Sequence, residues 1–177
     1  MKNISFEYIS KDILKNRKFQ RIASESHHGI TRMEHSLRVA RFVYKISKKL
    51  NLDYVSATRA AILHDFFTNE EFGDNHGLIQ GVVHPHIALQ NASGEFELND
   101  IEKNAIEAHM YPLCCIMPKY KESWVLTATD KIVAIYEYFS YKFNYTKLTS
   151  KVNGKLNLAV ILSSVSYTHL RAHETGR

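Results

Sequence analysis

The stretch Ala60-Ala61-Ile62-Leu63-His64-Asp65-Phe66 places two ionisable side chains next to each other in an otherwise apolar run. Burying such a pair costs free energy unless something compensates it. A divalent metal is one compensator, because histidine offers a neutral nitrogen and aspartate an oxygen that can also bridge two ions. A hydrogen-bonded His-Asp pair at the end of a helix is the alternative. The other His and Asp residues of the chain decide between the two.

The composition is that of one globular domain with its own core. The chain has 177 residues, of which 45% are hydrophobic and 23% charged. No apolar run is long enough to cross a membrane, and the N-terminus lacks the apolar middle of a signal peptide. The net charge of +5 is modest and scattered, which suits an anionic substrate but does not predict nucleic-acid binding. The adjacent Cys114 and Cys115 favour reduced thiols and a cytoplasmic protein.

The end of the chain differs in character from the rest. The run Val165-Ser166-Tyr167-Thr168-His169-Leu170-Arg171-Ala172-His173-Glu174-Thr175 resembles one translated reading frame of a sequencing adapter. We therefore expect residues 1–164 to form the domain and residues 165–177 to be a non-native tail. Its two histidines are left out of the candidate ligands.

Hydrophobic spacing predicts an all-α, single-domain helical bundle, since no segment shows the alternation of a strand. Thr31 with Glu34, and Asn99 with Glu102, have the spacing of capping boxes that begin helices. Residues 68–83 are rich in Gly and are expected to form a loop, with Pro85 in the first turn of the next helix. Helices are predicted over residues 6–15, 32–50, 54–67, 84–94, 100–111, 122–143 and 156–162. The aromatic residues near the end of the 122–143 helix fit packing in the core or in a homodimer.

Six His and Asp residues fall on or beside the apolar faces of these helices. A single inward histidine is more often a hydrogen-bonded core residue than a ligand, but six together favour a metal site. Oxygen and imidazole ligands of this kind suit Mn, Fe or Co, and no cysteine spacing resembles that of a zinc finger. The six are His35, His64, Asp65, His84, His109 and Asp130.

In this order, the segments that carry these residues resemble the HD-domain superfamily of metal-dependent phosphohydrolases. The segments are Glu34-His35-Ser36-Leu37-Arg38-Val39-Ala40, Leu63-His64-Asp65, His84-Pro85, Glu107-Ala108-His109-Met110 and Ala128-Thr129-Asp130-Lys131. The resemblance spans about residues 31–143. Met110 stands where the HD-GYP branch has a second histidine, and no Gly-Tyr-Pro follows, so the chain is similar to members outside that branch.

The resemblance implies a role for each residue. His35, His64, Asp65 and Asp130 match the ligands of a first metal ion, while Asp65, His84 and His109 match those of a second. One or two divalent ions would activate a water that cleaves a phosphoester of a nucleotide or a similar small phosphorylated molecule. Asp65 and Lys131 are the expected catalytic residues. Arg38, Arg32 and His28 are the expected substrate-binding residues, although surface salt bridges explain Arg38 and Lys131 equally well.

Two other functions stay open at this point. Some proteins of the same fold hold two irons with a six-ligand pattern and activate oxygen, so a di-iron oxygenase is one alternative. A non-catalytic nucleotide-binding module is another, and it would be expected to show damaged ligands. Neither nucleic acid nor a membrane is an expected partner.

Overall fold

The computed structural model describes residues 3–27, 30–72 and 78–142. Met1–Glu137 form one compact unit, and Tyr138–Arg177 form a second, of which residues 138–142 are described. The predicted helix over residues 156–162, the predicted boundary at residue 164, the tail and His28 all lie outside the described residues.

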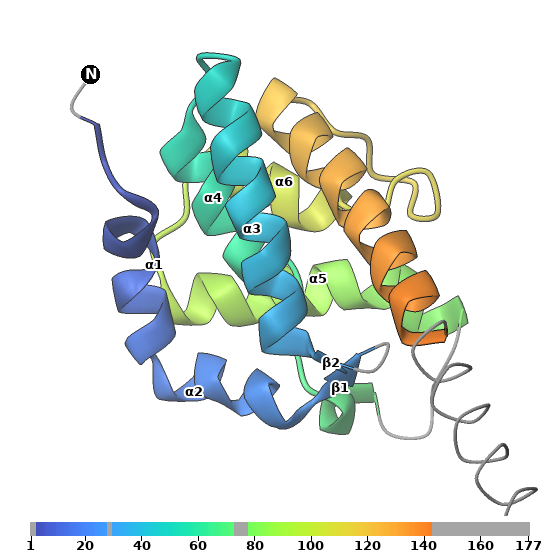
Figure 1. The fold of residues 1–177 in the computed structure, drawn as a ribbon. Coiled ribbons are helices and arrows are strands. Elements are labelled where there is room, and N and C mark those ends of the chain that lie inside the picture. Colours follow the sequence, from blue (N-terminus) through green and yellow to red (C-terminus); the bar gives the residue numbers. More distant parts are fainter. Residues whose placement is uncertain (1–2, 28–29, 73–77, 143–177) are drawn as a thin grey trace, which may run out of the picture. The chain divides into compact units, whose positions relative to one another are not determined.

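The first unit is built almost entirely from helices, which confirms the all-α prediction (Figure 1). None of the helices in its described part is long and apolar enough to cross a bilayer. The labelled helices are α1 (Phe6–Lys15), α2 (Arg17–Gln20), α3 (Arg32–Lys49), α4 (Tyr54–Leu63), α5 (Leu78–Glu95) and α6 (Asp100–Ala108), with short 3-10 turns η1 (Arg21–Ser24) and η2 (Asn69–Phe72). A further helix covers residues 121–142, of which 121–137 belong to this unit.

One small hairpin precedes α3. Strand β1 (Ser26–His27) pairs in antiparallel fashion with β2 (Ile30–Thr31), with Ser26 opposite Thr31. The sequence did not predict it, because strands of two residues are too short to show an alternating pattern.

Both predicted capping boxes are present. The Thr31 hydroxyl accepts a hydrogen bond from the Glu34 backbone N–H at 3.2 Å, and the Glu34 carboxylate accepts one from the Thr31 N–H at 2.8 Å. Asn99 and Glu102 make the same pair of bonds, both at 2.9 Å. These bonds satisfy backbone donors that have no partner inside the helix, and they fix where α3 and α6 begin.

The predicted start of the fourth long helix is wrong. Residues 69–72 form a 3-10 turn, and α5 begins at Leu78 and continues to Glu95, so Pro85 lies inside the helix. Proline at this position removes one backbone hydrogen bond, the one to the carbonyl of Gly81. Further along α5, Ala88 and Ala92 are fully buried, and their packing supports the helix despite this loss. His84 therefore sits within the helix and not at its start.

The helix α4 is also shorter than predicted, because it ends at Leu63 and not at Phe67. The chain turns there, with the Phe66 N–H donating to the Leu63 carbonyl at 3.1 Å. The turn buries the rings of Phe66 and Phe67, which are 2% and 4% exposed. His64 and Asp65 thus belong to a turn that is anchored by two buried aromatic rings.

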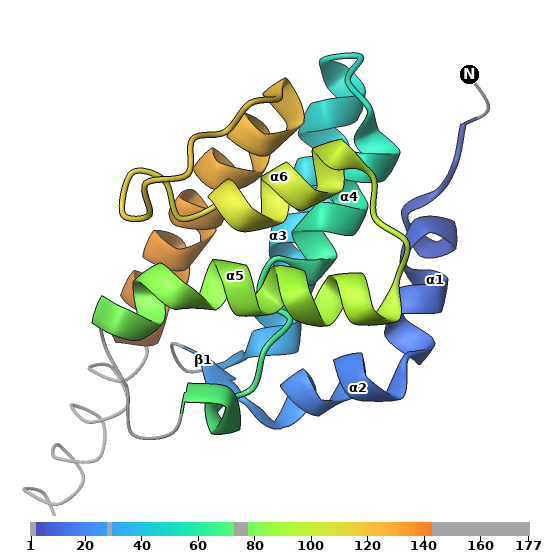
Figure 2. The ribbon, with the colours of Figure 1, turned by 180° about the vertical axis from the view of Figure 1, so that it is seen from behind.

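Small residues bring the central helices together. Ala57, Ala60 and Ala61 of α4 are fully buried, and α3 packs mainly against α4. Figure 1 shows α3 in front of α4 with the helix over residues 121–137 beside it, and Figure 2 shows α5 and α6 on the opposite side. The helix ends and faces that carry the candidate ligands thereby meet in the middle of the unit.

The outer face of the helix over residues 121–137 is apolar. Trp124, Ile132, Ile135 and Tyr136 are each about half or more exposed, so they do not belong to the core of this unit. Of the two explanations for the aromatic residues, core packing does not apply to Tyr136. The homodimer stays a prediction.

Candidate metal centre

His64 and His109 occupy the same position on two different helices. Each follows the last residue of its helix, α4 or α6, with helical backbone angles. The Nδ1 of His64 donates to the carbonyl of Ala61 at 2.8 Å, and the Nδ1 of His109 donates to the carbonyl of Ile106 at 2.7 Å. These carbonyls lack partners within the helix, so each imidazole caps its own helix end. The bond keeps the proton on Nδ1 and leaves Nε2 free to bind a metal.

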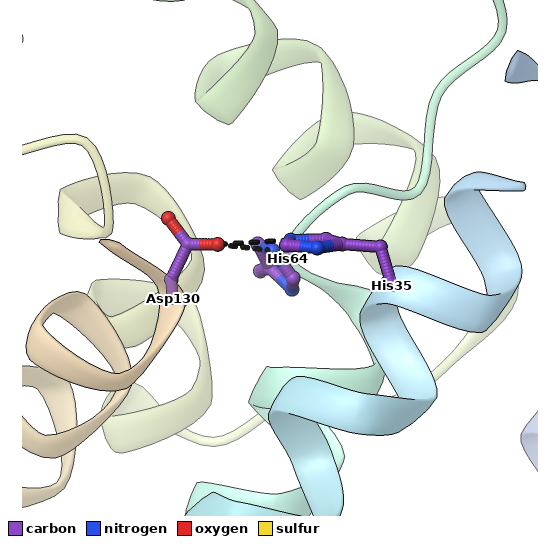
Figure 3. Close-up of side chains that lie close together, drawn as sticks. All are labelled: His35, His64 and Asp130. Carbon is purple, nitrogen blue, oxygen red and sulfur yellow. Dashed lines mark hydrogen bonds and ion pairs between the residues drawn. The ribbon is translucent and has the colours of Figure 1, made fainter. Parts of the chain in front are cut away.

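His35 and Asp130 bring α3 and the helix over residues 121–137 to the same point (Figure 3). The Nε2 atoms of His35 and His64 lie 3.0 and 3.3 Å from the Oδ1 atom of Asp130. The ring centroids of the two histidines are 5.5 Å apart, as expected from the small residues on α4. All three side chains are buried. Two ring nitrogens and one carboxylate oxygen therefore converge from three helices.

Asp65 lies between the remaining histidines. Its Oδ1 atom is 3.3 Å from the Nε2 of His84 and 3.8 Å from the Nε2 of His109, and its Oδ2 atom is 3.8 Å from the Nε2 of His64. The Nε2 atoms of His84 and His109 are themselves 2.9 Å apart. Asp65 is thus the residue that contacts both halves of the set.

This geometry fits a divalent cation. His35, His64 and Asp130 each offer a ligand atom, and these atoms lie within 4.8 Å of one another; His64, Asp65 and His109 form a second such group. The Nε2 of His64 is buried without a hydrogen-bond partner, although it faces two carboxylates. Two carboxylates face this nitrogen, so a metal cation bound here would be compensated by both of their charges.

When no metal ion is bound, protons on the histidines compensate part of the carboxylate charge. Burial lowers the pKa of His35, but its hydrogen bonds to Asp130 and Glu137 outweigh this effect and raise the pKa to about 10. Burial would raise the pKa of Asp130, but the hydrogen bond from His35 and the proximity of His64 hold it well below its usual range. Burial and the neighbouring His64 and His84 lower the pKa of His109 to about 3, so this ring is neutral. The site keeps its carboxylates ionised and holds a neutral donor ready in His109.

The three cationic residues predicted at the site are placed differently. Arg32 is 3% exposed; its guanidinium stacks over the ring of Phe67 at 3.6 Å and donates to the Phe67 carbonyl at 2.8 Å. It thereby holds the turn that follows Asp65. The Nζ of Lys131 donates to the backbone carbonyl of His109 at 3.0 Å, and burial lowers its pKa. Arg38 pairs with a carboxylate that the sequence did not single out.

That carboxylate is Glu137, seven residues after Asp130 on the same helix. One of its oxygens accepts a hydrogen bond from the Nδ1 of His35 at 2.7 Å, and the other contacts Arg38 at 2.5 Å. It is 3% exposed. The sequence could have indicated Glu137 by its spacing, because a residue seven places after Asp130 lies on the same face of a helix.

Part of this chain is similar to known proteins. The chain is 32% identical over 89 residues to "Ribonuclease Y" of Ureaplasma parvum serovar 3, in two strains. The match covers 50% of this chain but only 17% of those proteins. Comparison with solved structures gave no match. The family model for the HD domain matches residues 32–135, more than half of the chain, and includes all six candidate ligands. The chain therefore belongs to the HD domain family.

Proposed function

We propose that the protein is a metal-dependent phosphohydrolase that cleaves a phosphoester of a nucleotide or a similar small phosphorylated molecule. The HD superfamily consists generally of metal-dependent phosphohydrolases, and none of the six expected ligand positions is altered in this chain. The observation that carries the proposal is the convergence of their buried donor atoms, with His64 Nε2 left unpaired between two carboxylates.

In this proposal His35, His64, Asp65 and Asp130 would hold a first ion, with Asp65, His84 and His109 around a second. When bound, such an ion would supply a water acidic enough to lose its proton near neutral pH and positive charge for the phosphoryl oxygens. Manganese, iron and cobalt suit this mixture of imidazole and carboxylate donors.

The protein's own groups would orient and neutralise the reacting atoms. Burial would raise the pKa of Asp65, but the charge of His64 and the hydrogen bond from His84 keep it well below the usual value, so Asp65 stays ionised and ready to bind a metal. Lys131 lies beside Asp130 and is the proposed contact for charge that develops on phosphate. Arg32, and His28 four residues before it in the sequence, are the proposed substrate contacts. Phe67 fixes the orientation of the Arg32 guanidinium.

A second candidate substrate is supported by one comparison. The relatives that match are named ribonucleases, and RNA hydrolysis is also the cleavage of a phosphoester by water. The chain spans about a sixth of their length. The shared segment therefore supports a common metal-centre chemistry more strongly than a common substrate. Nucleotides and short single-stranded RNA therefore belong in the same assay.

The test is hydrolysis by purified protein supplied with Mn²⁺, Fe²⁺ or Co²⁺. Nitrophenyl phosphate mono- and diesters, a panel of nucleotides and short RNA serve as substrates. We expect turnover that Asp130→Asn reduces by orders of magnitude, while His86→Ala, which alters an exposed histidine on α5, keeps it. Failure of the wild-type protein to hydrolyse any of these with any metal would contradict the proposal. Iron content with oxygen consumption would instead favour the di-iron oxygenase.

A further inference from the structure

The three histidines on α3, α4 and α6 are held in two different ways. His64 and His109 direct Nδ1 at a backbone carbonyl of their own helix. His35 directs Nδ1 at the Glu137 carboxylate, 2.7 Å away on another helix, while its Nε2 faces Asp130. A carbonyl accepts the hydrogen bond from Nδ1 without bringing a negative charge to the ring. A carboxylate brings that charge and so also makes the opposite ring nitrogen more basic.

The buried carboxylate of Glu137 has a matched cation. Its side chain is 1% exposed, and a charge so deeply buried needs compensation. Arg38 provides it, through a contact of 2.5 Å to the second oxygen of Glu137, from a side chain that is 38% exposed. Arg38 lies three residues after His35 on α3, so both partners of Glu137 come from adjacent positions on one helix face.

We infer that Glu137 is a positioning residue that orients His35 toward the metal and strengthens it as a donor, and that Arg38 holds Glu137 in place. The inference rests on the proposed metal centre and extends it by two residues. Arg38, Glu137 and His35 thus form a series of contacts that runs from the surface to the Nε2 atom of His35. A neutral His35 that binds metal through Nε2 must carry its proton on Nδ1, and Glu137 is the acceptor placed there.

Two other roles for these residues predict different results. If the Arg38–Glu137 pair only joins two helices, its loss would lower stability without changing the metal. If Arg38 is instead the phosphate contact expected from the sequence, its loss would raise KM and leave metal affinity unchanged. Metal affinity in the absence of substrate therefore separates the three.

The chain offers a closely matched control. Glu102 of α6 is also 3% exposed and also pairs with an arginine of another helix, because its Oε1 atom accepts from the Nε of Arg59 at 2.6 Å. It contacts none of the six candidate ligands in the described hydrogen bonds and ion pairs. Glu102→Gln thus removes an equivalent buried charge at a distance from the site.

The experiment measures Co²⁺ affinity, by competition with a chelating dye, together with the visible spectrum of the bound Co²⁺. Glu137→Gln keeps the shape and an acceptor oxygen but not the charge, and should weaken Co²⁺ binding about 10- to 100-fold and alter the spectrum. Arg38→Gln should act in the same direction, and Arg38→Lys should restore part of the affinity. Glu102→Gln should keep both the affinity and the spectrum of the wild-type protein.

Wild-type affinity and spectrum in Glu137→Gln would overturn the inference while leaving the proposed function intact. An equal loss in Glu102→Gln would also overturn it, since the effect would then be one of stability. Conversely, a wild-type protein that binds Co²⁺ tightly but hydrolyses no phosphoester would contradict the proposed function and not the inference. A wild-type protein that binds no metal would contradict both.

Discussion

At the scale of single residues, His35 is the candidate ligand whose chemistry should change most when a metal binds. Its pKa of about 10 lies above its ordinary value of 6.5, so it is protonated in the metal-free protein at neutral pH. A metal must displace that proton. At mildly alkaline pH an ordinary histidine is already neutral, whereas His35 is still protonated. We therefore predict that Co²⁺ binding at this pH releases protons. Calorimetric titration in buffers of different ionisation enthalpy measures the release, and heats independent of the buffer would contradict it.

The same shift makes the metal-free fold sensitive to base. Because the folded pKa of His35 lies above the unfolded one, its protonation stabilises the fold fully below pH 6.5 and is lost as the pH rises toward about 10. Bound metal should remove this dependence, since the metal replaces the proton.

His109 tests the second group of ligands. It is neutral, fully oriented by the Ile106 carbonyl, and close to Asp65. If catalysis needs two ions, His109→Ala should lower kcat by orders of magnitude and reduce the metal content from about two ions per chain to about one. Elemental analysis alongside kinetics provides the measurement. Wild-type turnover and metal content in this variant would mean that the enzyme uses a single ion.

At the scale of elements, the two capping boxes allow a matched comparison. Thr31→Ala and Asn99→Ala should each lower the free energy of unfolding by about 1 kcal/mol, because each leaves a helix start uncapped. Only Thr31→Ala should also weaken metal binding, since His35 lies in the first turns of α3, whereas His109 follows the far end of α6. Chemical denaturation and Co²⁺ titration measure the two effects. Equal losses of affinity in both variants would show that general stability, and not helix position, controls the site.

The element boundaries show what sequence patterns can and cannot reveal. The capping boxes predicted where α3 and α6 begin, because the signal and the hydrogen bonds involve the same four residues. Pro85 misled the prediction of α5, because proline usually starts or ends a helix and here sits inside one. The end of α4 was missed because the turn there depends on the burial of Phe66 and Phe67 against other elements.

At the scale of the whole molecule, the candidate ligands could be named from the sequence, but their partners could not. Local spacing reveals a candidate ligand that lies on an apolar helix face, as with Asp130 beside Leu126 and Val133. The grouping of Asp65 with His64 and His109, and the pairing of Glu137 with His35, depend on how α3 and the 121–137 helix meet. No pattern within one helix contains that information.

The tail gives a prediction about the extent of the domain. Residues 165–177 read as adapter sequence, so we expect a chain ending at Ser164 to unfold at the same temperature and to bind the same amount of metal. Thermal denaturation of the two forms side by side is the check. A marked fall in Tm on removal of the tail would show that it packs against the fold.

Whether the converging histidines and aspartates hold a divalent metal is tested most simply by the metal content of the protein. The purified protein is loaded with metal and then dialysed to remove unbound metal. Elemental analysis should then find a transition metal in the wild type. His64→Ala and Asp65→Ala should lose it, while His86→Ala, on the exposed side of α5, should keep it. Full metal occupancy in both site variants, or none in the wild-type protein after loading, would contradict a metal centre at these residues.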